Sequence, residues 1–312
     1  MSKIIFQGIF GSHLYGTNVE TSDTDIRQVH KDSLDNIILR KGMDNSSEHS
    51  NPNQKNSSDD IDFDSTELRK FISSCLSGQT FAMDMLHSPK NLWKEYSDEW
   101  LFLQENKHLL VTNNVKPFIA YCKNQRDKYS KKGDKLNELI KLRQILSERN
   151  PKCLLSDVYK ETDELTFEHI KIKQIFNSGS KNVEFHLCVI DSSYPISRQI
   201  AEVLKSLDGK IDAFGKRALK AAENNGQDLK ATYHAFRVVW ELEELLNYGY
   251  LTFPSKRKEL LLKIRNGDYN KEFLDYWLVE EIDRVNKIEN HLPNPDYDFW
   301  NNWILTTYKK EI

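Results

Sequence analysis

Residues 11–27, GSHLYGTNVETSDTDIR, hold the residue types and spacing that point most directly to chemistry. Gly11-Ser12 follows a short apolar run and is expected to open a helix, where free backbone N–H groups and a hydroxyl can hold phosphate oxygens. Asp23 and Asp25 stand two residues apart, so on a strand both side chains face the same side. Two carboxylates on one face repel each other, and a divalent cation with oxygen ligands is their natural partner. The pattern therefore predicts metal-assisted phosphoryl or nucleotidyl transfer.

Either half of this pattern has a simpler explanation when it is taken alone. A Ser- and Asp-rich turn that caps a neighbouring element is common, and short motifs often match by chance. Residues 25–30, DIRQVH, alternate apolar and polar side chains as a strand does, and this favours the combined reading of a phosphate site beside a metal site. We expect Arg27 to lie on the other face of that strand and to serve as a structural ion-pair partner.

Gly11-Ser12, ten intervening residues and Asp23-Thr24-Asp25 resemble the signature of the DNA polymerase β-type nucleotidyltransferase superfamily. Within that superfamily, the chain is most similar to the predicted nucleotidyltransferases associated with RNA repair in bacteria and large phages. Three further stretches carry this narrower resemblance: residues 61–89, 118–125 and 228–254. The resemblance covers most of residues 4–125 and 215–270 and is loose over 134–214.

The resemblance implies a two-metal site. Asp23, Asp25 and a third carboxylate would hold two Mg²⁺ ions, with Mn²⁺ as a substitute, while Gly11 and Ser12 would bind the β- and γ-phosphates of an NTP. One ion would orient the triphosphate, and the other would lower the pKa of the attacking hydroxyl.

The third carboxylate has several candidates. Asp62 lies between two apolar residues on an expected strand and resembles the strand acid of the family, so it is the first choice. Asp84, in FAMDML, occupies a place where relatives usually carry Glu, and Asp64 lies on the same strand face as Asp62. Both stay open as alternatives.

A helix expected over residues 228–247 carries a polar stripe. Lys230, His234, Arg237 and Glu241 are spaced four, three and four residues apart, so they share one side of the helix. On pattern alone, this stripe is more often a solvated face. The resemblance instead implies a nucleotide-binding helix, in which Lys230 and Arg237 neutralise phosphates and His234 orients the base, the ribose or the acceptor.

The order of the expected elements predicts an α+β fold. We expect a polymerase-β-like catalytic core over residues 1–97, with a small mixed sheet, and a mainly helical domain over 98–312 with a β insertion around 150–214. Within the insertion, residues 164–176 and 183–190 flank the turn NSGSKN and indicate a hairpin. Residues 42–60 consist of turn and loop formers and are expected to be a mobile loop.

Composition narrows the class of protein. The 312 residues carry 44 basic and 47 acidic side chains, a net charge of −3, which excludes a uniformly basic nucleic-acid coat. Residues 123–152 have a local net charge of +6 and suit an RNA backbone or a solvated helix equally well. The four cysteines lack metal-type spacing, and neither a membrane span nor a signal peptide is evident, so we expect reduced thiols and a cytoplasmic protein.

Together these features predict a Mg²⁺-dependent enzyme that moves a nucleoside monophosphate from an NTP to a hydroxyl acceptor. Family association favours an RNA or tRNA 3′ end as the acceptor. Transfer to a protein hydroxyl, as in toxin–antitoxin nucleotidyltransferases, is a second possibility. A non-catalytic nucleotide- or RNA-binding module is a third.

Overall fold

The computed structural model describes residues 2–20, 22–39, 41, 45–49, 61–158, 167–176, 183–214, 219 and 228–309. Within these ranges, the side chains of residues 48, 49, 126–132, 176 and 183 are not part of the description. The central part of the basic segment 123–152 and most of the expected loop 42–60 therefore lie outside the described side chains.

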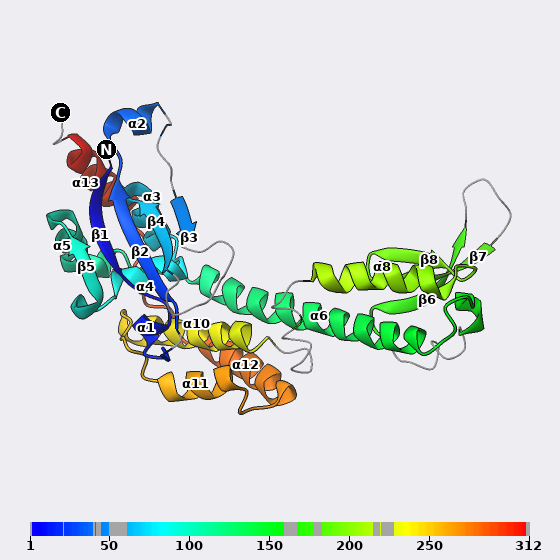
Figure 1. The fold of residues 1–312 in the computed structure, drawn as a ribbon. Helices are drawn as coiled ribbons and strands as arrows, with labels where there is room; N and C mark the ends of the chain where they lie inside the picture. Colours follow the sequence, from blue (N-terminus) through cyan, green and yellow to red (C-terminus); the bar gives the residue numbers. More distant parts are fainter. Residues whose placement is uncertain are drawn as a thin grey trace. The chain divides into compact units, whose positions relative to one another are not determined.

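A five-stranded mixed sheet organises the N-terminal part of the chain (Figure 1). In spatial order its strands are β3 (Asn45–His49), β4 (Ile61–Glu67), β2 (Thr24–Lys31), β1 (Lys3–Ile9) and β5 (Trp93–Tyr96). β2 and β4 run parallel, and every other neighbouring pair is antiparallel. This mixed sheet with its surrounding helices confirms the predicted α+β fold.

Helices pack on this sheet from both ends of the sequence. Those between the strands and up to the middle of the chain are α1 (Ser12–Tyr15), α2 (Leu34–Ile38), α3 (Leu68–Leu76), α4 (Thr80–Leu86), α5 (Asp98–Glu105) and α6 (Lys116–Ser147), with short 3₁₀ turns at Lys90–Leu92 and Lys107–Leu109. The C-terminal helices are α10 (Leu229–Tyr248), α11 (Lys258–Asn266), α12 (Lys271–Asn286) and α13 (Tyr297–Lys309). The apolar faces of these helices, in α6 only the N-terminal part, supply one continuous core, in which the rings of Phe6 on β1 and Trp100 on α5 stack at 3.9 Å.

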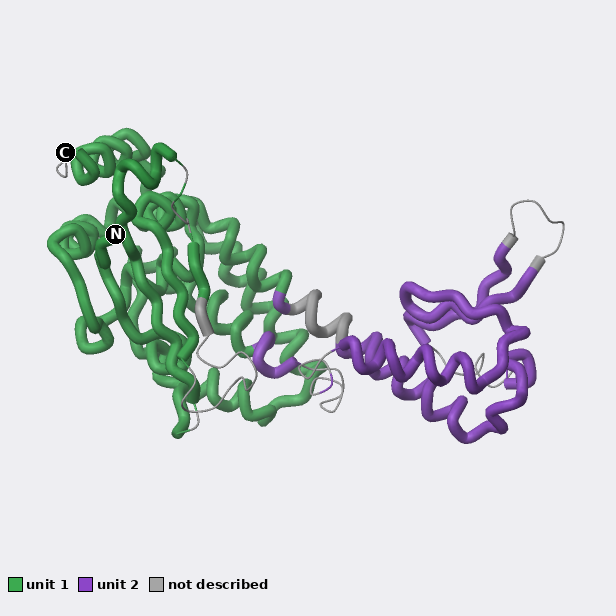
Figure 2. The backbone as a smooth tube through the Cα atoms, turned by 45° about the horizontal axis from the view of Figure 1, so that its top comes forward, with its two compact units in different colours: residues 1–124, 233–312 green, residues 125–232 purple. Residues whose placement is uncertain are grey.

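The chain divides into two compact units that do not follow the boundary expected at residue 97. One unit contains residues 1–124 and 233–312, and the other contains residues 125–232 (Figure 2). The physical reason is the shared core: Trp100, Phe236 and Trp300 are fully buried in the same cluster as the sheet. The C-terminal helices therefore belong to the unit that carries the sheet.

The second unit has a core of its own, built on a three-stranded sheet. β6 (Ile170–Phe176), β7 (Val183–Val189) and β8 (Ser192–Pro195) are antiparallel neighbours, followed by α8 (Ile200–Ala213), and a 3₁₀ turn covers Leu155–Asp157. The β6–β7 pair confirms the predicted hairpin, although its turn, residues 177–182, lies outside the described residues. β8 was not predicted, because four residues are too few to show a strand period.

β3 corrects the expectation of a loop over residues 42–60. Asn45–His49 pairs with β4 in an antiparallel ladder, from Asn45 opposite Thr66 to His49 opposite Asp62. This edge strand is polar throughout, so its backbone hydrogen bonds rather than apolar burial define it. Residues 42–44 and 50–60 of the expected loop lie outside the described part of the chain.

Two chain-wide expectations can be compared with the structure. All four cysteines are free thiols, and Cys75 and Cys122 are buried. Among the described residues, no helix combines the length and apolar character needed to cross a membrane.

His87, at the C-terminal end of α4, makes stability depend on pH. Its ring is buried, and Nδ1 donates a hydrogen bond to the carbonyl of Met83 at 2.9 Å. Burial lowers the pKa of His87 to about 4, so the unfolded chain binds this proton between about pH 6.5 and pH 4 and the folded chain does not. The contribution of His87 to stability is therefore fully present above pH 6.5 and is lost as the pH drops towards 4, by about 3 kcal/mol.

Urea unfolding of the wild type and of His87→Leu between pH 7 and pH 4 measures this effect. The loss of stability on acidification is expected to be smaller in His87→Leu by about 3 kcal/mol, because the buried leucine has no proton to take up. Parallel pH curves for the two proteins would contradict the assignment.

Candidate active site

A glycine turn places the start of α1 against β2. The backbone N–H of Phe10 donates to the carbonyl of Asp25 at 2.8 Å, and the chain then turns at Gly11, whose φ is +59°. A Cβ at Gly11 would lie 1.6 Å from Oδ2 of Asp25. The absence of a side chain at Gly11 therefore makes the room that the Asp25 carboxylate occupies, and α1 begins at Ser12 as the sequence predicted.

Gly11→Ala is expected to lower the nucleotidyl transfer predicted from the sequence at least about 100-fold, because a displacement of roughly 1 Å at a reacting group can cost that much. The positive φ adds about 1–2 kcal/mol of backbone strain. Gly209→Ala is the matched control. It lies within α8, an added Cβ meets nothing within 4 Å, and the helix should gain about 0.5–1 kcal/mol. Transfer assays and thermal unfolding of both variants check the difference, and full activity of Gly11→Ala would show that the turn is not needed to place Asp25.

Strand pairing brings two of the predicted acids together. Asp25 on β2 lies directly opposite Asp62 on the parallel strand β4, and Arg27 lies opposite Asp64 two register pairs further along. Side chains of paired residues face the same side, so the two carboxylates share one face of the sheet. Asp23 is half-buried and precedes β2, which starts at Thr24.

The donor set of this pair suits a hard divalent cation. Among the described residues, no three His, Cys, Asp or Glu side chains are close enough to form a metal-binding group. Mg²⁺, however, commonly binds through one or two carboxylates and completes its shell with water and substrate phosphates. Asp25 and Asp62 fit that requirement. Because Gly11 has no side chain, the Asp25 carboxylate can occupy this position and offer its oxygen atoms as ligands.

Ser12 presents an unused hydroxyl at the start of α1. Its Oγ is buried and has no hydrogen-bond partner among the described residues. The same holds for Nε2 of the adjacent His13. A buried polar atom without a partner costs about 1–3 kcal/mol, so such atoms are usually satisfied by water or a ligand. The hydroxyl lies one residue beyond the turn that packs on Asp25, where the sequence predicted a phosphate oxygen.

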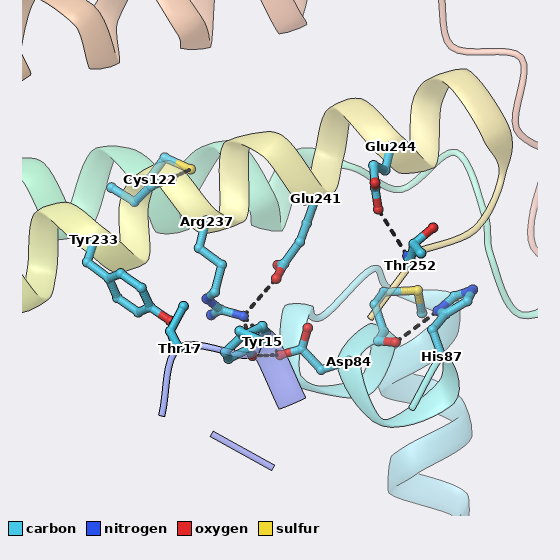
Figure 3. Close-up of polar contacts among 12 residues, drawn as sticks. Tyr15, Thr17, Asp84, His87, Cys122, Tyr233, Arg237, Glu241, Glu244 and Thr252 are labelled. Carbon is cyan, nitrogen blue, oxygen red and sulfur yellow. Dashed lines mark hydrogen bonds and ion pairs between the residues drawn. The ribbon is translucent and has the colours of Figure 1, made fainter. Parts of the chain in front are cut away.

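A buried ionic cluster holds α1 to α4 and α10 (Figure 3). The hydroxyl of Tyr15 donates to Oδ2 of Asp84 at 2.6 Å and accepts from Nη1 of Arg237, whose guanidinium lies 4.2 Å from the centre of the tyrosine ring. The same Nη1 donates to Asp84 at 3.2 Å and to Glu241 at 2.9 Å. A second contact, between the hydroxyls of Thr17 and Tyr233 at 2.8 Å, also joins the segment after α1 to α10.

The electrostatics of this cluster follow from its burial. Burial raises the pKa of Tyr15 well above its usual value and keeps the phenol protonated. Burial also raises the pKa of Glu241, against the pull of Arg237, and so favours its protonated form. Burial alone would lower the pKa of Arg237, but Glu241, Tyr15 and Asp84 together raise it. The result is an arginine that stays charged while it donates to Tyr15, Asp84 and Glu241.

The polar stripe of α10 has two different environments. Arg237 and Glu241 are buried, so the interpretation of the stripe as a solvated face is wrong for its C-terminal half. His234 is half-buried and meets the ring of Tyr233 edge-on, with the two ring centres 5.0 Å apart. Lys230 is exposed and belongs to the second compact unit. Sequence spacing alone missed the burial of Glu241 and the contact of Arg237 with Tyr15. The acid of FAMDML, Asp84, was the signal in the sequence that could have pointed to this cluster.

Two expectations about individual side chains change. Asp84, an alternative third carboxylate, is paired with Arg237 and Tyr15. Arg27 was expected on the opposite face from the acids, but strand alternation puts residues 25 and 27 on the same face. It forms no ion pair with a described residue. Its guanidinium instead lies 5.7 Å from the ring centre of Phe10.

Known proteins support the expected family. Residues 1–150 match the family model RlaP, described as the RNA repair pathway DNA polymerase beta family. The chain is also 27% identical over 330 residues to an uncharacterized 38.9 kDa protein in the nrdC–mobD intergenic region of Enterobacteria phage T4, and this match covers 98% of the chain and 97% of that protein. No solved structure matches the chain. The resemblance predicted from the sequence motifs is therefore confirmed: residues 1–150 are similar to the RNA-repair family of polymerase β-like nucleotidyltransferases.

Proposed function

We propose that this protein transfers a nucleoside monophosphate from an NTP to a hydroxyl of an RNA 3′ end, with a tRNA under repair as one such acceptor, and releases pyrophosphate. The observation that carries this proposal is the register of Asp25 with Asp62 beside the Gly11 turn. The RNA acceptor is supported by the description of the matching family, an RNA repair pathway.

In this reaction, the acceptor oxygen forms a bond to the α-phosphorus, the α–β phosphoanhydride bond breaks, and the acceptor proton leaves to solvent. Asp25 and Asp62, with Asp23 before the strand, would hold Mg²⁺, while the hydroxyl of Ser12 would donate to a phosphate oxygen. Bound Mg²⁺ stabilises the charge of the leaving pyrophosphate and lowers the pKa of the acceptor hydroxyl. Both substrates are cytoplasmic molecules, so we place the activity in the cytoplasm.

Asp62 is our choice for the third carboxylate. It lies beside Asp25 in the sheet, whereas Oδ2 of Asp84 already accepts from Tyr15 and Arg237, and only Oδ1 of Asp84 has no partner among the described residues. A carboxylate used in a buried ion pair is a poor metal ligand, because binding a cation would leave the arginine without its partner.

Incubation with each α-³²P-labelled NTP, Mg²⁺ and total cellular RNA tests the proposal. Label is expected on RNA with the wild type and not with the Asp23→Asn/Asp25→Asn double variant. Omission of Mg²⁺ or addition of EDTA should also abolish labelling. Label on a polypeptide instead of RNA would show that the acceptor is a protein. NTP binding without any labelled product would overturn the proposed transfer in favour of a non-catalytic binding module.

A further inference from the structure

A groove of about 470 Å³ opens on the sheet beside the acid pair. Strands β3 and β4 and helices α3 and α4 line it, together with Arg27 from β2. Arg27 and Asp64 form the second register pair beyond Asp25 and Asp62, so the groove begins about 7 Å along the strands and on the same face. A ligand in the groove can therefore reach the carboxylates directly.

Hydroxyl groups and cations dominate this lining. Ser46 on β3 and Ser73 and Ser77 on α3 contribute hydroxyls, and Lys70 on α3 contributes an exposed ammonium. The groove acid, Asp64, already accepts a hydrogen bond from Ser47 at 2.5 Å. Two cations against one satisfied carboxylate leave the groove positively charged and rich in hydrogen-bond donors.

Arg27 adds a donor that the protein does not use. Its Nη1 atom is buried and has no hydrogen-bond partner among the described residues. A guanidinium binds phosphate through paired N–H groups, which a lysine cannot reproduce, and an unsatisfied buried donor is costly. A phosphate oxygen bound in the groove would satisfy this atom.

The position of the groove decides which substrate it takes. In-line transfer puts the attacking hydroxyl and the leaving pyrophosphate on opposite sides of the α-phosphorus. The Gly11–Ser12 turn follows β1, on one side of β2, whereas the groove lies towards β4 and β3 on the other side. The pyrophosphate side of the reaction belongs to the turn, so the groove is left for the acceptor.

From these observations we propose that the groove between β3 and α3 binds the terminal nucleotides of the acceptor RNA, with Arg27 and Lys70 on backbone phosphates and the serine hydroxyls on ribose hydroxyls. This inference rests on the proposed nucleotidyl transfer and adds the place of its second substrate.

Binding can be measured without chemistry, so the test does not depend on turnover. The probe is a 5′-fluorescein-labelled 12-nucleotide RNA, followed by fluorescence anisotropy in the absence of NTP. Lys70→Glu/Ser73→Glu is expected to raise the Kd for this RNA at least tenfold, while the affinities for the four Mg²⁺–NTPs stay within twofold. Lys94→Glu is the control for the lysine-to-glutamate change, because it makes that substitution at an exposed position on β5, the far edge of the sheet, and should leave both affinities unchanged.

Arg27→Lys provides a second, more conservative variant. It keeps the charge but loses the paired donors, so we expect at least a fivefold weaker RNA affinity. The slope of the RNA affinity against salt concentration should fall less, relative to the wild type, in Arg27→Lys than in Lys70→Glu/Ser73→Glu. Thermal unfolding of all variants checks that they remain folded.

Equal RNA affinity of the wild type and the Lys70→Glu/Ser73→Glu variant would overturn the groove as an RNA-binding site. A wild type that binds no RNA would do the same, as would a variant that loses affinity for NTP as much as for RNA. A DNA of the same sequence that binds as tightly would overturn the ribose contacts. Groove-dependent RNA binding without labelled product from any NTP would instead reject the proposed transfer and leave the RNA site standing.

Discussion

Replacing Arg237 with alanine is expected to lower the free energy of unfolding by about 3–5 kcal/mol, because breaking a buried ion pair leaves its partner charge uncompensated. The arginine is buried and donates to Tyr15, Asp84 and Glu241 at once. Urea unfolding at pH 7 measures the loss. The variant should also transfer nucleotides poorly, because Tyr15 belongs to the helix that begins at Ser12.

Two comparisons separate buried charge from general damage. Lys256→Ala removes an exposed partner of Glu244, 3.5 Å away, and should cost less than about 1 kcal/mol. Adding Asp84→Asn and Glu241→Gln to Arg237→Ala should restore part of the lost stability, since the buried acids no longer need a cation. A triple variant less stable than Arg237→Ala would show that the cluster matters for its packing rather than its charge.

The second large effect distinguishes the two candidate third acids. Asp62→Asn should reduce the rate of nucleotidyl transfer about a thousandfold or more, because a metal site supplies several kcal/mol of charge stabilisation. Its free energy of unfolding should stay within about 1 kcal/mol of the wild type, since Asp62 faces another carboxylate across the strands. Single-turnover kinetics with labelled NTP and urea unfolding give both values.

Asp84→Asn should behave in the opposite way. Loss of the charge that pairs with Arg237 should cost about 2 kcal/mol of stability, whereas the transfer rate of the folded fraction should fall much less than in Asp62→Asn. Glu95→Gln, an acid-to-amide change at an exposed position on β5, is the control and should alter neither quantity. A folded, inactive Asp84→Asn beside an active Asp62→Asn would reverse our assignment.

The sequence was most informative where local pattern and pairing agree. Gly11 and Ser12 could be placed at a strand-to-helix turn, and the β6–β7 hairpin could be found from its alternation, because both features are local. The strand character of Asp62 was also visible, but its register with Asp25 depends on how two distant strands pair. That pairing is confirmed only by the folded sheet.

The features that could not be predicted depend on long-range contacts. A stripe such as that of Arg237 and Glu241 looks the same whether solvent or α4 faces it, so spacing alone cannot reveal a buried ion pair. The polar strand β3 lacks any apolar alternation and is defined by its ladder to β4. The grouping of residues 233–312 with the sheet likewise follows from a shared core that no local pattern records.

That interrupted unit has a consequence for synthesis on the ribosome. Arg237 is 153 residues from Asp84, and Tyr308, which donates to Glu67, is 241 residues from it. At about 5–20 residues per second, roughly 8–30 s pass between the appearance of Asp84 and that of its arginine. During this time, the sheet and its buried acids lack the C-terminal helices that complete their core. Nascent chains of this protein should therefore depend on chaperones that shield apolar surface until translation is almost finished.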